Sequence, residues 1–129
     1  MPGALLDTSV LIAPDASGAT AVPAAAISAV SMGELRAGVL RAPTATERTA
    51  RAARLEAIRS AYLPIPVDEA IADEYGRALA LARDDGQPAK ATDLLIIATA
   101  AATGRALVTR DERQASLARR AGLAVVVPA

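Results

Sequence analysis

Short apolar segments alternate along this chain with segments of helical character, and acidic residues stand at several of the boundaries between them. The apolar segments predict strands at 4–6, 24–28, 65–67, 106–108 and 123–127. Alternation of strands and helices is typical of a parallel sheet with helices on both faces. We therefore predict an α/β fold with a central parallel β-sheet flanked by helices on both faces.

Capping residues and helix breakers divide the remaining sequence. A cluster of Pro, Gly, Asp and Ser predicts a surface loop over 13–23. The predicted helices are a short one after Asp7, one from Ser28 or Ser31 to Leu40, and then 44–62, 69–83, 94–103 and a last one from Asp111 to Gly122. The helix over 94–103 is apolar all round, which predicts a central, buried position.

The length of 129 residues suits one domain, and we expect 1–129 to form a single domain. The longest strongly apolar run, Leu94 to Ala102, is far shorter than the roughly 20 residues that span a bilayer. The sequence has no cysteine and no signal-peptide pattern. We therefore expect a cytoplasmic protein with no membrane partner.

The absence of both Cys and His removes most familiar active sites. A Ser-His-Asp triad, a cysteine nucleophile, an imidazole base and a thiolate or imidazole zinc site are all excluded. Carboxylates remain as the main candidates for chemistry.

Four acidic residues, Asp7, Glu34, Asp93 and Asp111, follow predicted strands or lie near the start of predicted helices. In an open α/β sheet such positions converge on the crevice at the carboxyl ends of the strands. Clustered carboxylates repel one another unless a cation lies between them, and hard divalent ions prefer oxygen ligands. The constellation therefore predicts a site for Mg²⁺ or Mn²⁺.

Each acid also has an ordinary structural interpretation. Asp7 and Asp111 could simply cap the helices that follow them, and Asp93 or its neighbour Thr92 could do the same. Glu34 could be a solvated residue of its helix. Glu112 lies beside Asp111 and could replace it in the site.

Four stretches carry a resemblance to a known family. They are L-L-D-T-S-V-L-I at 5–12, S-x-x-S-M-G-E-L-R-x-G-V at 28–39, T-D-L-L-I-I-A-T-A at 92–100 and G-R-A-L-V-T-R-D at 104–111. In order and spacing, the chain resembles the PIN-domain family, in particular the small VapC-type toxins of toxin–antitoxin pairs. Many members of that family carry an aromatic residue shortly after the fourth stretch, and many have Asn in place of Asp111. This chain departs from both patterns.

The resemblance implies a metal-dependent endoribonuclease toxin that cleaves structured RNA, tRNA or rRNA, and inhibits translation. It also implies a cofactor, Mg²⁺ or Mn²⁺, a VapB-type antitoxin and a homodimer. The catalytic and metal-binding residues would be Asp7, Glu34, Asp93 and Asp111, supported by Thr8, Ser9 and Thr109.

RNA would have to approach this acidic site with the help of cations. Arg110, Lys90 and Arg36 each lie close in sequence to one of the acids and are candidates for phosphate contacts. The helix over 44–62 has two apolar stripes, which predicts contacts with two neighbours, and one of these neighbours could be another protein chain.

Two rival interpretations stay open at this stage. A catalytically inert PIN-like module could bind RNA or protein without cleaving it. A phosphoacceptor receiver domain also has an acidic Mg²⁺ pocket, but it would require an acidic pair after the first strand and a lysine late in the chain. This chain offers a lone Asp7 there, and its only lysine is Lys90.

Overall fold

The computed structural model describes residues 3–12 and 24–128. The predicted loop over 13–23 lies outside the described residues. The elements follow in the order β1 Ala4–Leu6, α1 Thr8–Leu11, β2 Ile27–Ser28, α3 Ala29–Leu40, α4 Ala45–Ala61, β3 Pro64–Ile65, α5 Glu69–Asp84, α6 Ala91–Thr103, β4 Ala106–Val108, α7 Glu112–Arg120 and β5 Val125–Val126.

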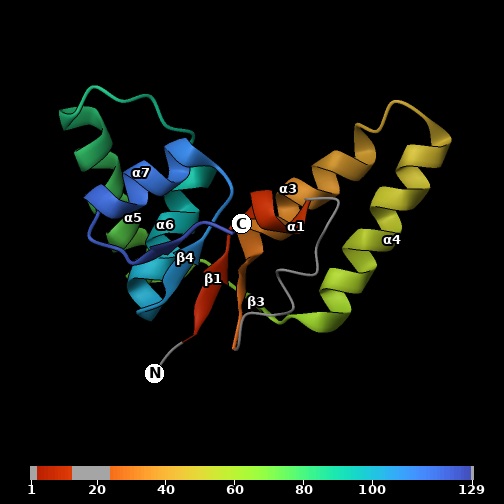
Figure 1. The fold of residues 1–129 in the computed structure, drawn as a ribbon, viewed down its shortest axis with the longest axis horizontal. Helices are drawn as coiled ribbons and strands as arrows, with labels where there is room; N and C mark the ends of the chain where they lie inside the picture. The colour runs from red at the N-terminus through yellow and green to blue at the C-terminus, as the bar shows by residue number, and fades with distance from the viewer. Residues whose placement is uncertain (1–2, 13–23, 129) are drawn as a thin grey trace.

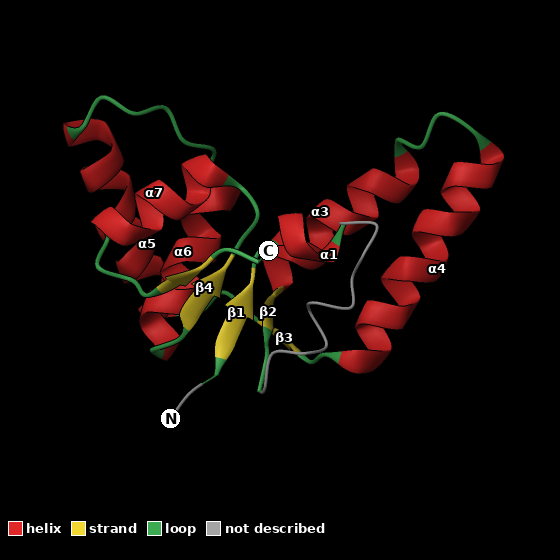
Figure 2. Cartoon of the chain, viewed as in Figure 1, coloured by secondary structure: helices red, strands yellow, loops and turns green. Residues whose placement is uncertain are grey.

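The strands are all parallel and lie side by side in the order β3, β2, β1, β4, β5 (Figure 2). The pair β2–β3 is joined to the other three by a single parallel bridge between Leu5 and Ala26. Strand β1 is therefore central, with β2 on one side and β4 on the other. After β1 the chain adds β2 and β3 on one side of this strand, and it later adds β4 and β5 on the other side. Open α/β sheets form their sites at such a switch point in the strand order.

Helices cover both faces of the sheet, as predicted (Figure 1). Side chains alternate across a strand, so Leu6 and Leu5 enter different cores. Leu6 packs with the buried residues of α1, α3 and α4, whereas Leu5 packs with those of α5, α6 and α7. Both cores consist of aliphatic residues and alanine, because the chain has only two aromatic residues, both tyrosines.

The helix predicted over 94–103 is central and buried, with Ile96, Ala98 and Ala100 fully shielded from solvent. Its predicted start was wrong, because α6 begins at Ala91 with Lys90 as the N-cap residue. Thr92 and Asp93 therefore lie inside the first turn and neither caps the helix. Its end at Gly104 was predicted correctly, since this glycine adopts the left-handed conformation with φ 67°.

Most other helix boundaries agree with the sequence prediction. Ser28 caps α3, its hydroxyl accepting from Val30 N at 3.0 Å, and Thr44 caps α4, accepting from Glu47 N at 3.1 Å. Strands β1 and β4 have the predicted limits. Strands β2 and β5 are shorter than predicted, because each contains only two residues. Strand β3 begins one residue earlier and ends two residues earlier than predicted, and Pro64 begins it, where a missing N–H costs little.

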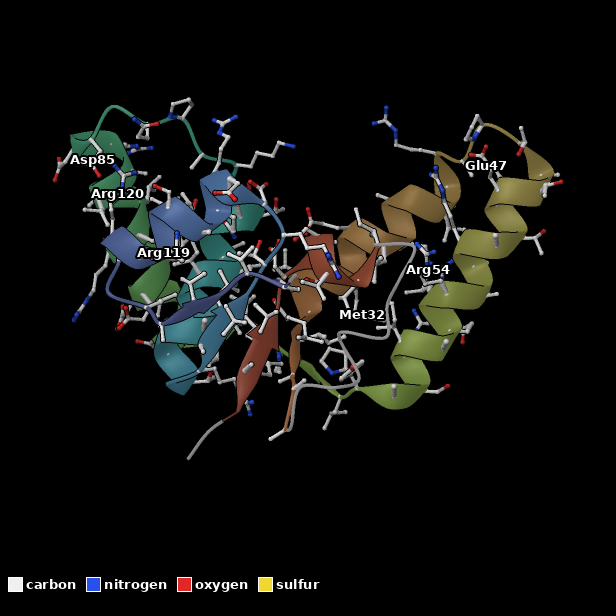
Figure 3. All side chains as sticks on the ribbon, viewed as in Figure 1. Met32, Glu47, Arg54, Asp85, Arg119 and Arg120 are labelled. Atoms are coloured by element: carbon white, nitrogen blue, oxygen red, sulfur yellow. The ribbon has the colours of Figure 1, made fainter. Side chains whose placement is uncertain are left out.

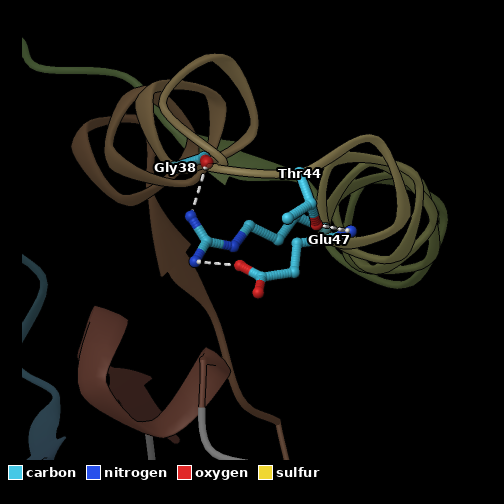
Figure 4. A network of polar contacts seen from close by, with 4 residues as sticks. Gly38, Thr44 and Glu47 are labelled. Carbon is cyan, nitrogen blue, oxygen red and sulfur yellow. Dashed lines mark hydrogen bonds and ion pairs between the residues drawn. The ribbon is translucent and has the colours of Figure 1, made fainter.

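Helices α3 and α4 form a hairpin that extends away from the sheet (Figure 1). Arg51 of α4 donates from Nη1 to the carbonyl of Gly38 at 2.8 Å and pairs with Glu47 at 3.5 Å (Figure 4). Arg54, also on α4, donates to the carbonyl of Ile12 at 3.0 Å and lies between α4 and the body of the molecule (Figure 3). Arginines of α4 thus satisfy carbonyls near the ends of α3 and α1.

One apolar stripe of α4 is buried and the other is not. Leu55 and Ile58 are buried against the first core, with Tyr62 packed beside them. The alanine stripe at 50, 53, 57 and 61 is exposed to solvent. Among residues 3–12 and 24–128, no helix is long and apolar enough to cross a membrane.

Candidate active site

The four predicted acids come from four different elements at the carboxyl end of the sheet. Asp7 directly follows β1, and Asp111 follows β4 after two further residues. Glu34 lies in the second turn of α3, which begins where β2 ends, and Asp93 lies in the first turn of α6. The parallel topology, with β1 between β2 and β4, positions these residues next to one another.

Asp7 is buried, with an exposed fraction of 4%, and a cluster of hydroxyl groups holds one of its oxygens. Its Oδ2 accepts from Ser9 Oγ at 2.6 Å, from Thr109 Oγ1 at 2.9 Å and from the Ser9 backbone N at 3.3 Å. Asp7 is therefore the N-cap of α1, as the structural interpretation predicted. Because the hydrogen bonds among described residues all reach Oδ2, Oδ1 remains available for another ligand.

The same hydroxyl cluster ties β1 to the segment after β4. Ser9 Oγ and Thr109 Oγ1 lie 3.2 Å apart. The backbone N of Arg110 donates to Ser9 Oγ at 3.0 Å, and the backbone N of Asp111 donates to Thr109 Oγ1 at 3.1 Å. Thr109 is fully buried, so these bonds are shielded from water. The orientation of Asp7 is thereby linked to the start of the segment that carries Asp111.

Glu34 is half-buried and is not a freely solvated helix residue. Thr8 Oγ1 donates to its Oε1 at 2.7 Å, and the same hydroxyl lies 2.8 Å from Ser31 Oγ. Thr8 belongs to α1 and Glu34 to α3, so this contact joins the helices after β1 and β2. It directs Glu34 toward the end of the sheet where Asp7 lies.

Asp93 shows most directly that the acids influence one another. Burial raises the pKa of its carboxyl above the ordinary value, and the negative charges of Asp7, Glu34 and Asp111 raise it further. Lys90, one turn earlier in the chain, acts in the opposite direction. The Asp93 side chain makes no hydrogen bond to any other residue in the described part of the chain. Its charge is therefore left uncompensated apart from Lys90.

Asp111 caps α7, its Oδ1 accepting from the backbone N of Arg113 at 2.9 Å and of Gln114 at 3.2 Å. It lines a pocket together with Asp93. The alternative residue Glu112 is exposed and lines a different hollow, beside Gln87 and Arg120. The geometry thus favours Asp111 over Glu112 as the neighbour of Asp93.

Gln114 is a residue of this site that the sequence did not reveal. Its side chain is 3% exposed, and its Nε2 donates to the backbone carbonyl of Asp93 at 2.9 Å. Its own backbone N holds the carboxylate of Asp111. The sequence feature that could have indicated this residue is the absence of an aromatic side chain shortly after the fourth stretch. Gln114 lies in that region, and its polar side chain is buried there.

The donor set fits a hard divalent cation, since it consists of carboxylates and hydroxyls only, one acid being buried and another carrying a raised pKa. Within residues 3–12 and 24–128, no three acidic side chains are close enough together to form a ready-made ligand cage. Uncompensated carboxylates repel one another, and three of these four hold hydroxyl or amide donors instead. The carboxylate oxygens that accept no hydrogen bond from the described residues would hold such an ion.

The candidate phosphate-binding cations occupy different environments. Lys90 is exposed and lines the same pocket as Asp93 and Asp111. Arg36 is exposed on α3. Arg110 is half-buried, and its Nε is buried without a hydrogen-bond partner in the described part of the chain.

Comparisons with known proteins identify the family of this chain. The family model described as PIN domain matches residues 4–120. Ribonuclease VapC8 of Mycobacterium tuberculosis strain H37Rv is 43% identical over 100 residues, which cover 74% of this chain and 88% of that protein. Ribonuclease VapC5 of the same strain is 32% identical over 126 residues, covering 95% and 93%.

A solved structure shows the same fold over nearly the whole chain. The crystal structure of VapBC-5 from Mycobacterium tuberculosis, a member of the VapBC family of toxin–antitoxin systems, superimposes with a TM-score of 0.80 at 32% identity. The match covers 96% of this chain and 95% of that one. The chain belongs to the PIN-domain family, and the proteins that it resembles are VapC ribonucleases. The receiver-domain interpretation is therefore wrong.

Proposed function

We propose that this protein is a divalent-metal-dependent endoribonuclease and the toxin of a VapBC-type pair. It cleaves structured RNA, with tRNA or rRNA as the target, and so inhibits translation in the cytoplasm. Residues 1–129 act as one nuclease domain. The observation that carries the proposal is the convergence of four acids from four elements at the carboxyl end of the sheet, where burial and the charges of the other three raise the pKa of Asp93.

Asp7, Glu34, Asp93 and Asp111 would hold Mg²⁺ or Mn²⁺ through the carboxylate oxygens that are not bound by hydroxyl or amide donors. Such an ion, when bound, polarises the scissile phosphate and makes water a better nucleophile. With no histidine in the chain, proton transfer falls to a carboxylate or to solvent.

Thr8, Ser9 and Thr109 act as orienting residues. Ser9 and Thr109 hold Asp7 on one oxygen, and Thr8 holds Glu34 on one oxygen. Fixed carboxylates lose less conformational entropy when an ion binds, because their rotamers are already restricted. Lys90, Arg36 and Arg110 would contact phosphates on either side of the scissile bond.

A protein partner would cover the site when the toxin is inactive. The proteins in the VapBC-5 structure form a toxin–antitoxin system, and we extend that relationship to this chain. A groove of about 470 Å³ beside Glu34, lined by Ile12, Leu35, Gly38 and the arginines Arg51 and Arg54, is the surface that we propose for a VapB-type antitoxin peptide. We also propose a homodimer, which size-exclusion chromatography with light scattering would test.

The nuclease proposal is tested by sequencing RNA ends after incubation of the antitoxin-free protein with total RNA and Mg²⁺ or Mn²⁺. We expect new ends at a small number of positions in tRNA or rRNA, abolished by a chelator and by Asp7→Asn. Asp73→Asn is the matched control, because Asp73 is exposed in the second turn of α5 and is not one of the four acids.

Two results would contradict the proposal. Cleavage that persists in Asp7→Asn would show that the activity comes from elsewhere. A folded wild-type protein that binds metal and RNA but produces no new ends would instead favour the inert binding module.

A further inference from the structure

A pocket of about 430 Å³ opens beside the acidic residues, between the first turns of α6 and α7 and the loop that precedes α6. Its volume lies within the range of known ligand pockets, about 300 to 1,000 Å³. Its wall contains the carboxylates of Asp93 and Asp111, the cationic side chains of Lys90 and Arg113, and the apolar side chains of Pro88 and Leu117. Neither Arg113 nor the two apolar residues belong to the acidic constellation described above.

The charges of the wall fall into two pairs. Asp93 and Asp111 are proposed metal ligands, so in the loaded protein the ion compensates their negative charge. Lys90 and Arg113 then remain as two positive charges in the same pocket. An anion is the ligand that such a pocket attracts, and a phosphate would accept hydrogen bonds from both cations.

The pocket has fixed walls. Arg113 Nη2 donates to the carbonyl of Pro88 at 3.4 Å, which ties α7 to the loop. The ion pair between Arg120 and Asp85, at 2.9 Å, joins the other end of α7 to the end of α5 (Figure 3). The loop over 86–90 is therefore held at Asp85, where it begins, and at Pro88, in its middle. Arg113 donates only one side-chain hydrogen bond within the described residues, so its remaining N–H groups can reach a ligand.

We propose that this pocket, the flanking-nucleotide pocket, binds the nucleotide of RNA next to the scissile phosphate. Lys90 and Arg113 contact the phosphate of that nucleotide, and Pro88 and Leu117 contact its ribose or base. The proposal rests on the proposed ribonuclease function, because the pocket shares Asp93 and Asp111 with the candidate active site. A substrate strand whose scissile phosphate lies at those acids must continue along this wall.

Binding can be separated from cleavage by measuring binding with Ca²⁺, which prefers the same oxygen ligands, in place of Mg²⁺ or Mn²⁺, so that Asp7 and a bound ion are both retained. The probe is a short, fluorescently labelled single-stranded RNA, titrated by fluorescence anisotropy at several salt concentrations. We expect Arg113→Ala and Lys90→Ala each to weaken binding about tenfold and to lower the slope of log affinity against log salt by about 0.7, one phosphate contact each.

The control is Arg59→Ala, which removes the same charge from an exposed arginine that pairs only with Glu56 on α4 among the described residues. We expect it to leave the salt slope unchanged. Arg113→Lys keeps the charge and should restore the slope, because a phosphate contact needs a cation rather than the bond to Pro88. Thermal melts verify that every variant is folded.

The flanking-nucleotide pocket is overturned if Arg113→Ala weakens RNA binding no more than Arg59→Ala, or if Arg113→Lys behaves like Arg113→Ala. It is also overturned if an acidic peptide requires Arg113 for binding whereas RNA does not. Failure of the nuclease proposal looks different. Wild-type protein would then leave RNA intact, while RNA binding would still depend on Lys90 and Arg113.

Discussion

Gln114 of α7 donates a 2.9 Å hydrogen bond from Nε2 to the backbone carbonyl of Asp93 on α6. Its backbone N–H at the same time donates to the carboxylate of Asp111 at 3.2 Å. One buried residue thus contacts two of the proposed metal ligands, one through its side chain and the other through its main chain. The relative position of α6 and α7 at the site depends on this residue.

Gln114→Leu keeps the side-chain volume and removes the donor. We expect the affinity for Mg²⁺ or Mn²⁺ to fall several-fold, with a loss of stability of about 1 kcal/mol. Isothermal titration with metal and a chelator-treated thermal melt measure the two effects separately. Gln87→Leu, at an exposed position, is the control. Unchanged metal affinity in Gln114→Leu would mean that the contact only stabilises the fold.

Thr109→Val removes the hydroxyl that donates to Asp7 Oδ2 and accepts from the backbone N of Asp111. The bond to Asp7 is buried and the bond to Asp111 is partly buried, so we expect a loss of about 1 to 3 kcal/mol in stability and a lower metal affinity. Denaturant unfolding and metal titration test this. Thr103→Val removes a hydroxyl that only bonds carbonyls of its own helix, and it should leave metal affinity unchanged.

Asp93→Asn should stabilise the metal-free protein at pH 7 while reducing metal binding. The folded-state pKa of Asp93 is raised above its ordinary value of 3.8. The stability that the protonated Asp93 carboxyl contributes is therefore fully present below pH 3.8. That contribution is lost as pH rises through the raised pKa. Thermal melts in chelator between pH 4 and 8 should give the variant a higher melting temperature than the wild type only at the upper end of this pH range.

Asp73→Asn serves as the control for the pH series, since Asp73 is exposed on α5. If Asp93→Asn and wild type melt at the same temperature throughout, then neither burial nor the neighbouring acids raise the pKa of Asp93. In the wild type, metal affinity should fall as pH decreases through the raised pKa, because protons and metal compete for the carboxylate.

Arg51→Ala should loosen the α3–α4 hairpin without affecting metal binding. The substitution removes the bond to the Gly38 carbonyl and the pair with Glu47. Both are exposed, so we expect a stability loss below about 1 kcal/mol. Amide hydrogen exchange in α4 should be faster in Arg51→Ala than in Arg59→Ala, which breaks a pair inside that helix. Equal exchange in the two variants would show that Arg51 does not hold the hairpin.

The sequence by itself determined the α/β class and most helix limits. Hydrophobic periodicity and residues such as Thr44, Asp68 and Gly104 act locally, within a turn of the helix they cap or end. The apolar residues after Asp93 were enough to place α6 in the interior. The limits of β1 and β4 were predicted correctly, whereas β2, β3 and β5 were predicted too long, because a strand exists only where a neighbour pairs with it, and pairing is a long-range property.

Only the tertiary structure decided how the acids are held. The contacts of Thr109 with Asp7 and of Thr8 with Glu34 join residues far apart in the chain, and no local pattern encodes them. The same holds for Gln114, whose partner Asp93 is 21 residues away. Residue types fixed the chemistry that is available, an oxygen-only donor set without histidine or cysteine. The parallel order of β2, β1 and β4 determined which of these acidic residues lie near one another, because it brings the carboxyl ends of the three strands to one edge of the sheet.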